Sequence, residues 1–360
     1  MKKKKIQFSF GGALESPKDS RTIQHSDLAQ AGAPLVSGGI EYLPEDIDNQ
    51  FNVGICTAIH ITQNRGKKNG KKYSPEFQYL LQKKFYDKNW DEGSSIFYAL
   101  KVAKNYGFLP QEIWTTVVDK VPELGFLNES DRKLTYAKFI AKLKLIPDEE
   151  ITRLIGLCVD KIAGYAAVDI SDAQKIAKAV NDSGVGILCR YIVGKEWYTS
   201  IDGRISWAPK DINPIRPPVN PICGHAITMS AFDYTNSIKQ TLPNTWGKEW
   251  CRNGSCDILF DSYKPTEAWI ILDEVPVVPE FKFLIDLYYG IMSPDVKQLQ
   301  IRLNKDPRTQ VASTGAGSPG NETEFFGGLT LRAVKKYQIL NGIKPVYGYV
   351  GPITREVLNR

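Results

Sequence analysis

Histidine is scarce in this chain of 360 residues, which contains only His25, His60 and His225. Any chemistry that depends on an imidazole must therefore use one of these three positions. Cysteine is sparse as well, since six residues lie far below the density of a disulfide-stapled scaffold. No uninterrupted apolar run reaches about 18 residues, so we expect no membrane-spanning helix.

Composition and charge are those of an ordinary globular protein. Hydrophobic residues make up 42% of the chain and charged residues 24%, which excludes a disordered or collagen-like protein. The formal net charge of +6 is small and dispersed, so we expect no nucleic-acid partner. The basic run at 65–72 is interpreted as a solvated loop. At roughly 100–200 residues per domain, the length favours two domains or one large one.

The first residues do not have the pattern of a secretory signal peptide. Four lysines follow Met1, but no apolar core of about 7–15 residues comes after them. Residues 1–40 carry Gly, Ser, Ala, Pro and charges with little periodicity, and we interpret them as an extended N-terminal arm. Composition alone leaves the compartment of the protein open.

The order of predicted elements indicates the fold class. Apolar spacing predicts helices at 53–61, 75–85, 95–106, 116–160 and 170–180, the fourth helical throughout. Strands are predicted at 185–192, 226–232 and 269–272. Because helices come first and strands afterwards, we expect an α+β domain with a mainly antiparallel sheet, followed by a linker at 276–283.

Residues 284–360 form a separate predicted unit with neither Cys nor His and a charge of +4, ten Lys and Arg minus six Asp and Glu. One pattern occurs twice in it, at 326–330 and 350–354, each time before a helical segment. In each copy Gly makes the turn, and Thr330 or Thr354, three residues later, suits a helix N-cap. We predict a compact helical module with a long polar loop at 309–324.

Three short segments carry possible chemistry. Cys56 begins an apolar helical stretch, where the helix dipole favours thiolate, and Gln50 can direct its amide to the same place. His225 stands where a loop enters an apolar strand, and Asn244 follows nineteen residues later. Taken singly, each feature also fits a structural residue: a core cysteine, a satisfied histidine, or a turn beside an aromatic ring.

Taken together and in order, these segments resemble the papain-like (C1 family) cysteine peptidases over about 45–275. The resemblance rests on Gln50 with Cys56, on Gly224-His225-Ala226, and on Asn244-Thr245-Trp246-Gly247. Between them, Glu92-Gly93-Ser94-Ser95 resembles the family's substrate-cleft segment. The resemblance implies a two-lobe fold at 41–275, with a helical lobe, an antiparallel β lobe and a helical insertion at 116–160.

The resemblance also implies a role for each matching residue. Cys56 would be the nucleophile and His225 the acid and base, while Asn244 would orient the imidazole. Gln50 and the backbone N–H of Cys56 would form the oxyanion hole. The substrate-binding residues would be Gly93, Ser94, Gly224 and Trp246, the last also shielding the histidine's hydrogen bond from water.

The sequence departs from the family pattern at several positions. Val53 stands where many secreted members have a disulfide cysteine, and Ile55 and Thr57 replace the usual neighbours of the nucleophile. The interval from Cys56 to His225 is 169 residues (225 minus 56), longer than the about 130–150 typical of the family. Ser94 replaces a common Gly, which leaves subsite preference open.

The same cysteines and histidines permit other interpretations. Cys223, His225, Cys251 and Cys256 include enough ligand types for zinc, but their spacing is not that of a common finger, so we expect no metal and no cofactor. Cys251 and Cys256 form either a disulfide or two thiols. His60, one helical turn after Cys56, is interpreted as a packed helix residue rather than a second base.

The C-terminal unit resembles peptidoglycan-binding-domain-1 modules at 293–304, 326–338 and 348–354. The resemblance implies a small three-helix module at 284–360 that anchors the protein to bacterial cell wall. The alternative is a module that has become an intramolecular lid or another protein-binding surface. No ligand site is visible in its sequence, so its fold is better supported than its ligand.

The combined expectation is a monomeric cysteine endopeptidase, extracellular or cell-wall associated, which acts on protein or peptide substrates and binds peptidoglycan. The alternatives are a lysin that cleaves peptidoglycan peptides and a catalytically silent cell-wall-binding protein. The segment 16–21 resembles the short leader that precedes the catalytic domain in bacterial relatives. We therefore expect the arm to act as a propeptide that lies across the cleft and restrains activity.

Overall fold

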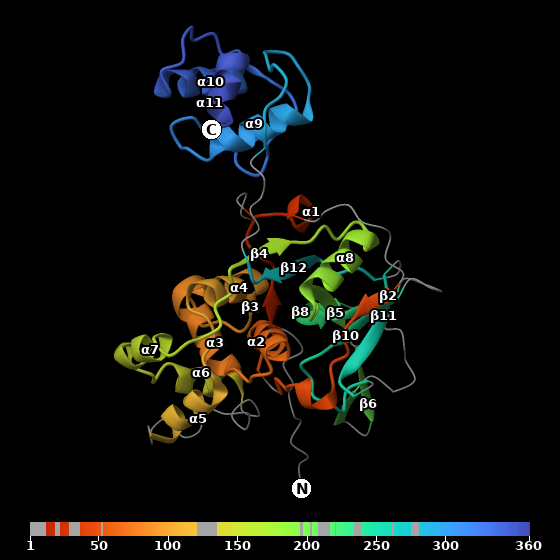
Figure 1. Cartoon of the computed structure of the whole chain (residues 1–360). Coiled ribbons are helices and arrows are strands. Elements are labelled where there is room, and N and C mark those ends of the chain that lie inside the picture. The colour runs from red at the N-terminus through yellow and green to blue at the C-terminus, as the bar shows by residue number, and fades with distance from the viewer. Residues whose placement is uncertain are drawn as a thin grey trace. The chain divides into compact units, whose positions relative to one another are not determined.

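The computed structural model describes residues 12–18, 22–28, 37–51, 53–120, 135–194, 197–201, 204–207, 217–219, 221–233, 239–251, 253–260, 263–274 and 281–360. The chain divides into two compact units (Figure 1), of which the first holds Met1–Pro17 and Ile23–Pro276 and the second Lys18–Thr22 and Val277–Arg360. Residues 276–280 of the predicted linker and much of the predicted arm lie outside the described residues.

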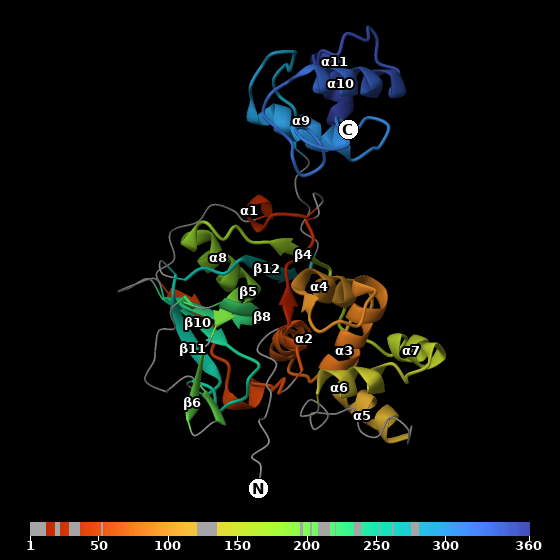
Figure 2. The same cartoon turned by 180° about the vertical axis from the view of Figure 1, so that it is seen from behind.

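The six helices from α2 to α7 form one side of the first unit (Figures 1 and 2). They pack around a cluster of buried side chains that includes Phe77, Trp114 and Phe139. A π-helical turn, η2 (Gln82–Asp87), continues directly from α3. The helices are α2 (Cys56–Asn69), α3 (Pro75–Leu81), α4 (Ile96–Asn105), α5 (Gln111–Lys120), α6 (Tyr136–Leu143) and α7 (Asp148–Ile155).

The strands form the other side of the first unit. One four-stranded sheet has the order β4-β12-β5-β8, and the other has the order β11-β10-β9-β2. Neighbouring strands in both sheets are antiparallel, so the mixed α and β class predicted from the order of elements is confirmed. The strands are β2 (Ser37–Gly39), β4 (Gly164–Ala167), β5 (Ile187–Gly194), β8 (Pro221–Met229), β9 (Ala231–Asp233), β10 (Lys239–Pro243), β11 (Ser255–Leu259) and β12 (Glu267–Leu272).

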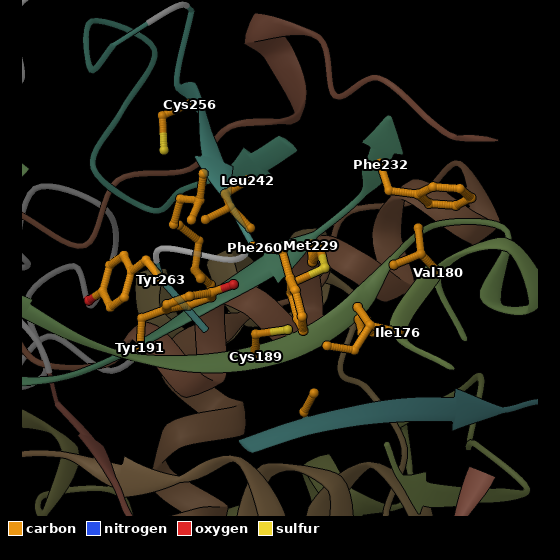
Figure 3. Close-up of a cluster of buried hydrophobic side chains, with 14 of the residues drawn as sticks. Ile176, Val180, Cys189, Tyr191, Met229, Phe232, Leu242, Cys256, Phe260 and Tyr263 are labelled. Carbon is orange, nitrogen blue, oxygen red and sulfur yellow. The ribbon is translucent and has the colours of Figure 1, made fainter. Parts of the chain in front are cut away.

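The core of the β side lies among these strands and α8 (Ala173–Ser183). Figure 3 shows Tyr191 and Cys189 from β5, Met229 from β8 and Leu242 from β10 among its side chains. The Asp172 side chain caps α8 by accepting a hydrogen bond from the N–H of Gln174 at 2.8 Å. A separate hairpin pairs β6 (Tyr198–Ile201) with β7 (Arg204–Trp207).

The two sides meet along α2. Figures 1 and 2 both show α2 between the other helices and β8. A third apolar cluster joins Cys56 and Phe97 on the helical side to Leu188, Ala226 and Trp269 on the strands. The first residue of α2 therefore lies at the boundary between the lobes.

The structure differs from the prediction at the basic run 65–72, which is not a solvated loop. α2 continues through Asn69 and ends at Gly70, whose φ is +64°. Arg65 is buried, donates from Nε to the carbonyl oxygen of Asp160 at 3.2 Å and pairs with Asp273, and Lys67 pairs with Asp46 at 2.6 Å. Partners distant in sequence extend the helix, which local composition does not reveal.

The predicted continuous helix at 116–160 is also wrong. α5 begins before this range and is described to Lys120, while residues 121–134 lie outside the described part of the chain. α6 and α7 are separate short helices, with Pro147 between them at the N-cap of α7. Proline disfavours the α conformation of the residue before it, which explains the break.

The second unit contains α9 (Pro294–Asn304), α10 (Gly328–Leu340) and α11 (Pro352–Leu358). Gly327 and Gly351 are the N-caps of α10 and α11, so the prediction that Thr330 and Thr354 cap these helices is wrong. Both threonines are buried, and their hydroxyls accept from Gln300 Nε2 at 2.9 Å and Gln338 Nε2 at 3.0 Å, respectively.

The repeated pattern thus folds into two similar polar contacts. Each glutamine also donates to a backbone carbonyl just before the capping glycine, Gln300 to Phe325 at 3.1 Å and Gln338 to Tyr349 at 2.8 Å. No helix in the described part of the chain is long and apolar enough to cross a bilayer.

Candidate active site

Cys56 occupies the first position of α2, as the sequence predicts, and is fully buried. Its sulfur accepts a hydrogen bond from the N–H of Ala226, with an N···S distance of 3.5 Å. Ala226 follows His225 on β8, so the two sequence segments that hold Cys56 and His225 meet at this sulfur. The end of a helix and the middle of a strand thereby place a thiol beside an imidazole-bearing residue.

His225 is buried and lies 2.6 Å from Asn244, between Nε2 of the ring and Oδ1 of the amide. An amide oxygen only accepts hydrogen bonds, so this contact holds a proton on Nε2. Nδ1 is buried, and within the described part of the chain it has no hydrogen-bond partner. Asn244 is itself held in place, because its Oδ1 accepts from the N–H of Thr245 at 2.7 Å.

An aromatic group covers this hydrogen bond. The Trp246 ring stacks on the imidazole of His225, with centroids 4.6 Å apart and an interplanar angle of 25°. Trp197 and Trp250 contact Trp246 edge-on, at centroid distances of 6.1 and 5.5 Å. Three buried indoles exclude water from the His225–Asn244 contact, and a polar contact in such a low-dielectric environment is strengthened.

Gln50 is brought to the same site by the segment that follows Asn244. The N–H of Gln50 donates to the carbonyl of Thr245 at 2.8 Å, and the Thr245 hydroxyl donates to Gln50 Oε1 at 2.7 Å. This second contact directs the amide oxygen toward Thr245 and leaves Nε2 as the donor end of the side chain. The Thr245 position is part of the Asn-x-Trp-Gly pattern, but its role was not predicted from the sequence.

Gly12 and Ala13 of the N-terminal arm lie between Gly93–Ser94 and Gly224, in a space that we call the passage. The Ser94 N–H donates to the Gly12 carbonyl at 2.7 Å, and the Gly12 N–H donates to the Gly224 carbonyl at 3.1 Å. A Cβ added at Gly93 would lie 2.5 Å from the Gly12 oxygen, and one at Gly224 would lie 2.2 Å from the Ala13 oxygen. Only glycine permits this close approach at either position.

The arm segment forms a short strand there. β1 (Ala13–Leu14) pairs in parallel with β3 (Ser94–Ser95), and Ala13 is buried in the same apolar cluster as Cys56. The Arg190 guanidinium donates to the Ala13 carbonyl from Nε at 2.9 Å. Figures 1 and 2 show the red strand β1 beside the start of α2.

Burial determines the charge states of the two reactive side chains. Burial raises the pKa of the Cys56 thiol to about 12 and lowers the pKa of His225 to about 4. Both shifts favour the neutral thiol and imidazole in this covered arrangement, in contrast to the thiolate expected from the helix dipole alone. Loss of solvent around a charge outweighs the partial charge at the helix terminus here.

The other histidines and the cysteines occupy different places. His60 is buried, with Nδ1 3.2 Å from the Thr228 hydroxyl and its ring edge-on to His225 at 6.0 Å, as a packed residue next to the site. Among the described residues, no group of three or more His, Cys, Asp or Glu side chains is arranged to hold a metal ion, so the zinc alternative is not assembled. Cys251 and Cys256 are buried in the β-side core.

Glu92 is a further residue whose position the sequence did not reveal. Its Oε1 accepts from the N–H of Gly54 at 2.7 Å, which ties the loop before Cys56 to the loop before Ser94. Glu92 belongs to the segment Glu92-Gly93-Ser94-Ser95 that the resemblance includes, but its contact with Gly54 was not predicted. The Arg190 contact with the arm had no sequence indication, because Arg190 lies within an apolar strand.

No protein-family model matches the chain, and no curated protein matches it. Among solved structures, xylellain, a cysteine protease from Xylella fastidiosa, is 18% identical, covers 76% of this chain and 98% of its own, and has a TM-score of 0.51.

Two proform structures match with lower TM-scores. The digestive procathepsin L 3 of Tenebrio molitor larval midgut is 11% identical, with 75% of this chain and 74% of that chain covered and a TM-score of 0.41. The ragweed pollen cysteine protease Amb a 11, in its proform, is 14% identical, with 69% and 70% covered and a TM-score of 0.42. On the strength of the xylellain match, the chain has the fold of the papain-like cysteine proteases over about three quarters of its length.

Proposed function

We propose that this protein is a cysteine endopeptidase that hydrolyses peptide bonds through an acyl-enzyme intermediate. The observation that carries the proposal is the 2.6 Å contact between His225 Nε2 and Asn244 Oδ1. His225 lies on β8, and the next residue of this strand, Ala226, donates its N–H to the Cys56 sulfur. A buried thiol, an imidazole and an orienting amide are the three groups that this chemistry needs. The xylellain-like fold supports the same assignment.

The mechanism begins with the transfer of the Cys56 proton to Nδ1 of His225, the nitrogen that Asn244 does not bind. The thiolate then attacks the substrate carbonyl carbon, and Nδ1–H protonates the leaving amine as the C–N bond breaks. Water, deprotonated by the same nitrogen, hydrolyses the thioester. Asn244 keeps the ring in one orientation throughout, because its oxygen is itself fixed by Thr245.

The oxyanion formed in both steps needs donors at the start of α2. The Cys56 backbone N–H and the Gln50 amide are the proposed donors, since Thr245 already binds the other end of that amide. One such donor is worth about 3 kcal/mol of transition-state stabilisation. Gly93, Ser94, Gly224 and Trp246 are proposed to line the substrate cleft.

In this proposal the arm covers the active site, so the structure is that of an inactive precursor. Gly12 and Ala13 occupy the passage beside Cys56 through hydrogen bonds to Ser94, Gly224 and Arg190. A substrate needs the same space and the same Ser94 N–H. Withdrawal or removal of the arm would admit water and substrate, and both pKa shifts at Cys56 and His225 would diminish.

Targeting to bacterial cell wall is the second part of the proposal and rests on the resemblance of 284–360 to peptidoglycan-binding modules. An extracellular or cell-wall location follows from it, with protein as the favoured substrate. The module has no His or Cys and carries a charge of +4, so its contribution is binding rather than chemistry.

Substitution of the nucleophile tests the enzymatic part. Cys56→Ala is expected to abolish hydrolysis of a fluorogenic peptide and labelling by an epoxide thiol reagent, because no other group supplies the thioester. Cys158→Ala, which removes a half-buried free thiol outside the site, is the matched control and should retain both. Full activity in Cys56→Ala would refute the peptidase assignment. A silent fold would be indicated if neither the full chain nor a chain beginning at Gly39, which lacks the arm, cleaves the peptide or is labelled.

A further inference from the structure

Lys83 is a buried cation next to the proposed cleft. It lies on the π-helical turn η2 (Gln82–Asp87), and 0% of its side chain is exposed. Lysine is almost never fully buried unless it is paired, because the loss of hydration is costly. A lysine retained in such a place calls for a specific partner.

The nearest partner of the Lys83 ammonium is the backbone carbonyl of Gly93, to which Nζ donates a short hydrogen bond. The carboxylate of Asp87 is farther, at 3.3 Å, beyond the about 2.7–2.9 Å of a strong charge-assisted bond. Nζ also lies 5.4 Å from the ring centroid of Tyr79, whose hydroxyl accepts from the Gly93 N–H at 3.1 Å. Lys83 and Tyr79 together hold both backbone groups of Gly93.

The residue before Lys83 contacts the nucleophile helix. Gln82 is buried, and its Oε1 accepts from the hydroxyl of Thr57, the residue after Cys56, at 3.0 Å. Two consecutive residues on one turn therefore bind the start of α2 and the start of β3. A π-helical turn, with its extra residue, is a common way to direct side chains at functional sites.

No disulfide holds the loop before Cys56 against the loop before Ser94. The loops 50–55 and 90–93 contain no cysteine, so no disulfide can tie the nucleophile loop to the cleft strand. The spacing between them depends on polar contacts, which include the Gly54–Glu92 bond and the buried Lys83 bond to Gly93. Gly93 is followed by Ser94, whose N–H already binds a peptide carbonyl, that of Gly12 at 2.7 Å.

We propose that Lys83 is a positioning residue that sets the Gly93–Ser94 backbone relative to Cys56, so that an extended peptide can pair with β3 while its carbonyl reaches the thiolate. The inference rests on the proposed peptidase function. Lys83 touches no reacting atom and acts through the Gly93 carbonyl. Its effect is therefore on the binding of substrates long enough to reach Ser94.

The test compares a long and a short substrate on the full chain. In Lys83→Met, KM for a fluorogenic peptide with several residues on the acyl side is expected to rise about tenfold, the loss of one backbone hydrogen bond, with kcat changed less than about twofold. An activated ester of a single acylated amino acid, too short to pair with β3, should be hydrolysed at the wild-type rate. Lys84→Met, which removes the neighbouring partly exposed lysine, is the matched control.

A double variant separates positioning from charge pairing. Lys83→Met with Asp87→Asn leaves no unpaired buried charge and keeps a polar side chain beside Ser94, so it should fold as well as the wild type. Positioning requires that its KM for the long peptide stays raised; a return to the wild-type KM, or equal losses on both substrates, overturns the inference.

Hydrogen exchange provides a readout that does not need activity. The amides of 93–96 should exchange at least several-fold faster in the double variant than in Lys84→Met, and equal exchange overturns the inference. If neither the wild type nor a chain beginning at Gly39, which lacks the arm, hydrolyses either substrate, the proposed peptidase function fails, and this exchange measurement alone decides whether Lys83 anchors the strand.

Discussion

At the scale of single residues, all three histidines of the chain are buried, and burial is the first cause of a lowered pKa in each of them. His25 lies in the arm helix α1 (His25–Leu28), 2.9 Å from Asp182 of α8, and His60 lies beside His225. Scarcity and burial together mean that every imidazole resists protonation in this fold. Protonation of any of the three histidines at low pH should therefore lower the free energy of unfolding.

His225 gives the measurable case. Its pKa is lowered to about 4, below the ordinary value near 6.5 of the unfolded chain, so the unfolded state binds more protons in between. The contribution of the neutral, buried His225 to the free energy of unfolding is fully present above pH 6.5 and is lost as the pH falls toward 4. Denaturant unfolding at pH 7 and pH 5 should show a loss that is about 2 kcal/mol smaller in His225→Gln than in the wild type. An identical pH dependence in the two proteins would contradict the burial argument.

At the scale of elements, the arm strand β1 is held by backbone hydrogen bonds to Ser94 and Gly224 and by one side-chain donor, Arg190. Gly12 has a φ of +142°, and a Cβ there would lie 2.3 Å from the Gly54 carbonyl oxygen. Both the conformation and the space demand glycine at this position. The arm can therefore lie in the passage only with glycine at position 12.

Gly12→Val is expected to displace the arm, because the clash involves backbone atoms that have no alternative position. Alkylation of Cys56 by iodoacetamide in the full chain, followed by mass spectrometry of its peptide, should then become more than about tenfold faster. Glu15→Ala changes an exposed side chain of the same segment and should leave the rate unchanged. An unaltered rate in Gly12→Val would mean that the arm does not restrict access.

The elements also show where local patterns suffice. Ser74 and Asp172 cap α3 and α8, and each cap bonds to its own helix, so it depends on neighbouring residues only. α2 extends further than its apolar residues indicate, because Arg65 and Lys67 bond to groups from other segments. Short strands such as β10 and β11 were missed, since pairing with each other, not alternation, defines them.

At the scale of the whole molecule, the chain is two compact units with different expected tasks. The full chain is predicted to sediment with purified bacterial sacculi, whereas a chain ending at residue 274 should stay in solution. Equal sedimentation of the two would contradict cell-wall targeting by 284–360. New free amino groups in the sacculi, absent with Cys56→Ala, would favour the alternative of a lysin over a protein-cleaving enzyme.

The sequence by itself determined the fold class and the candidate residues Gln50, Cys56, His225 and Asn244, because residue type and order along the chain carry the resemblance. Their distances, the stacking of Trp246 and the role of Thr245 were decided only by the tertiary structure, which joins segments nearly 200 residues apart. The same holds for the covered state of the site. The helix dipole at Cys56 is a local property, but the burial that outweighs it comes from strands, aromatic rings and an arm brought together by folding.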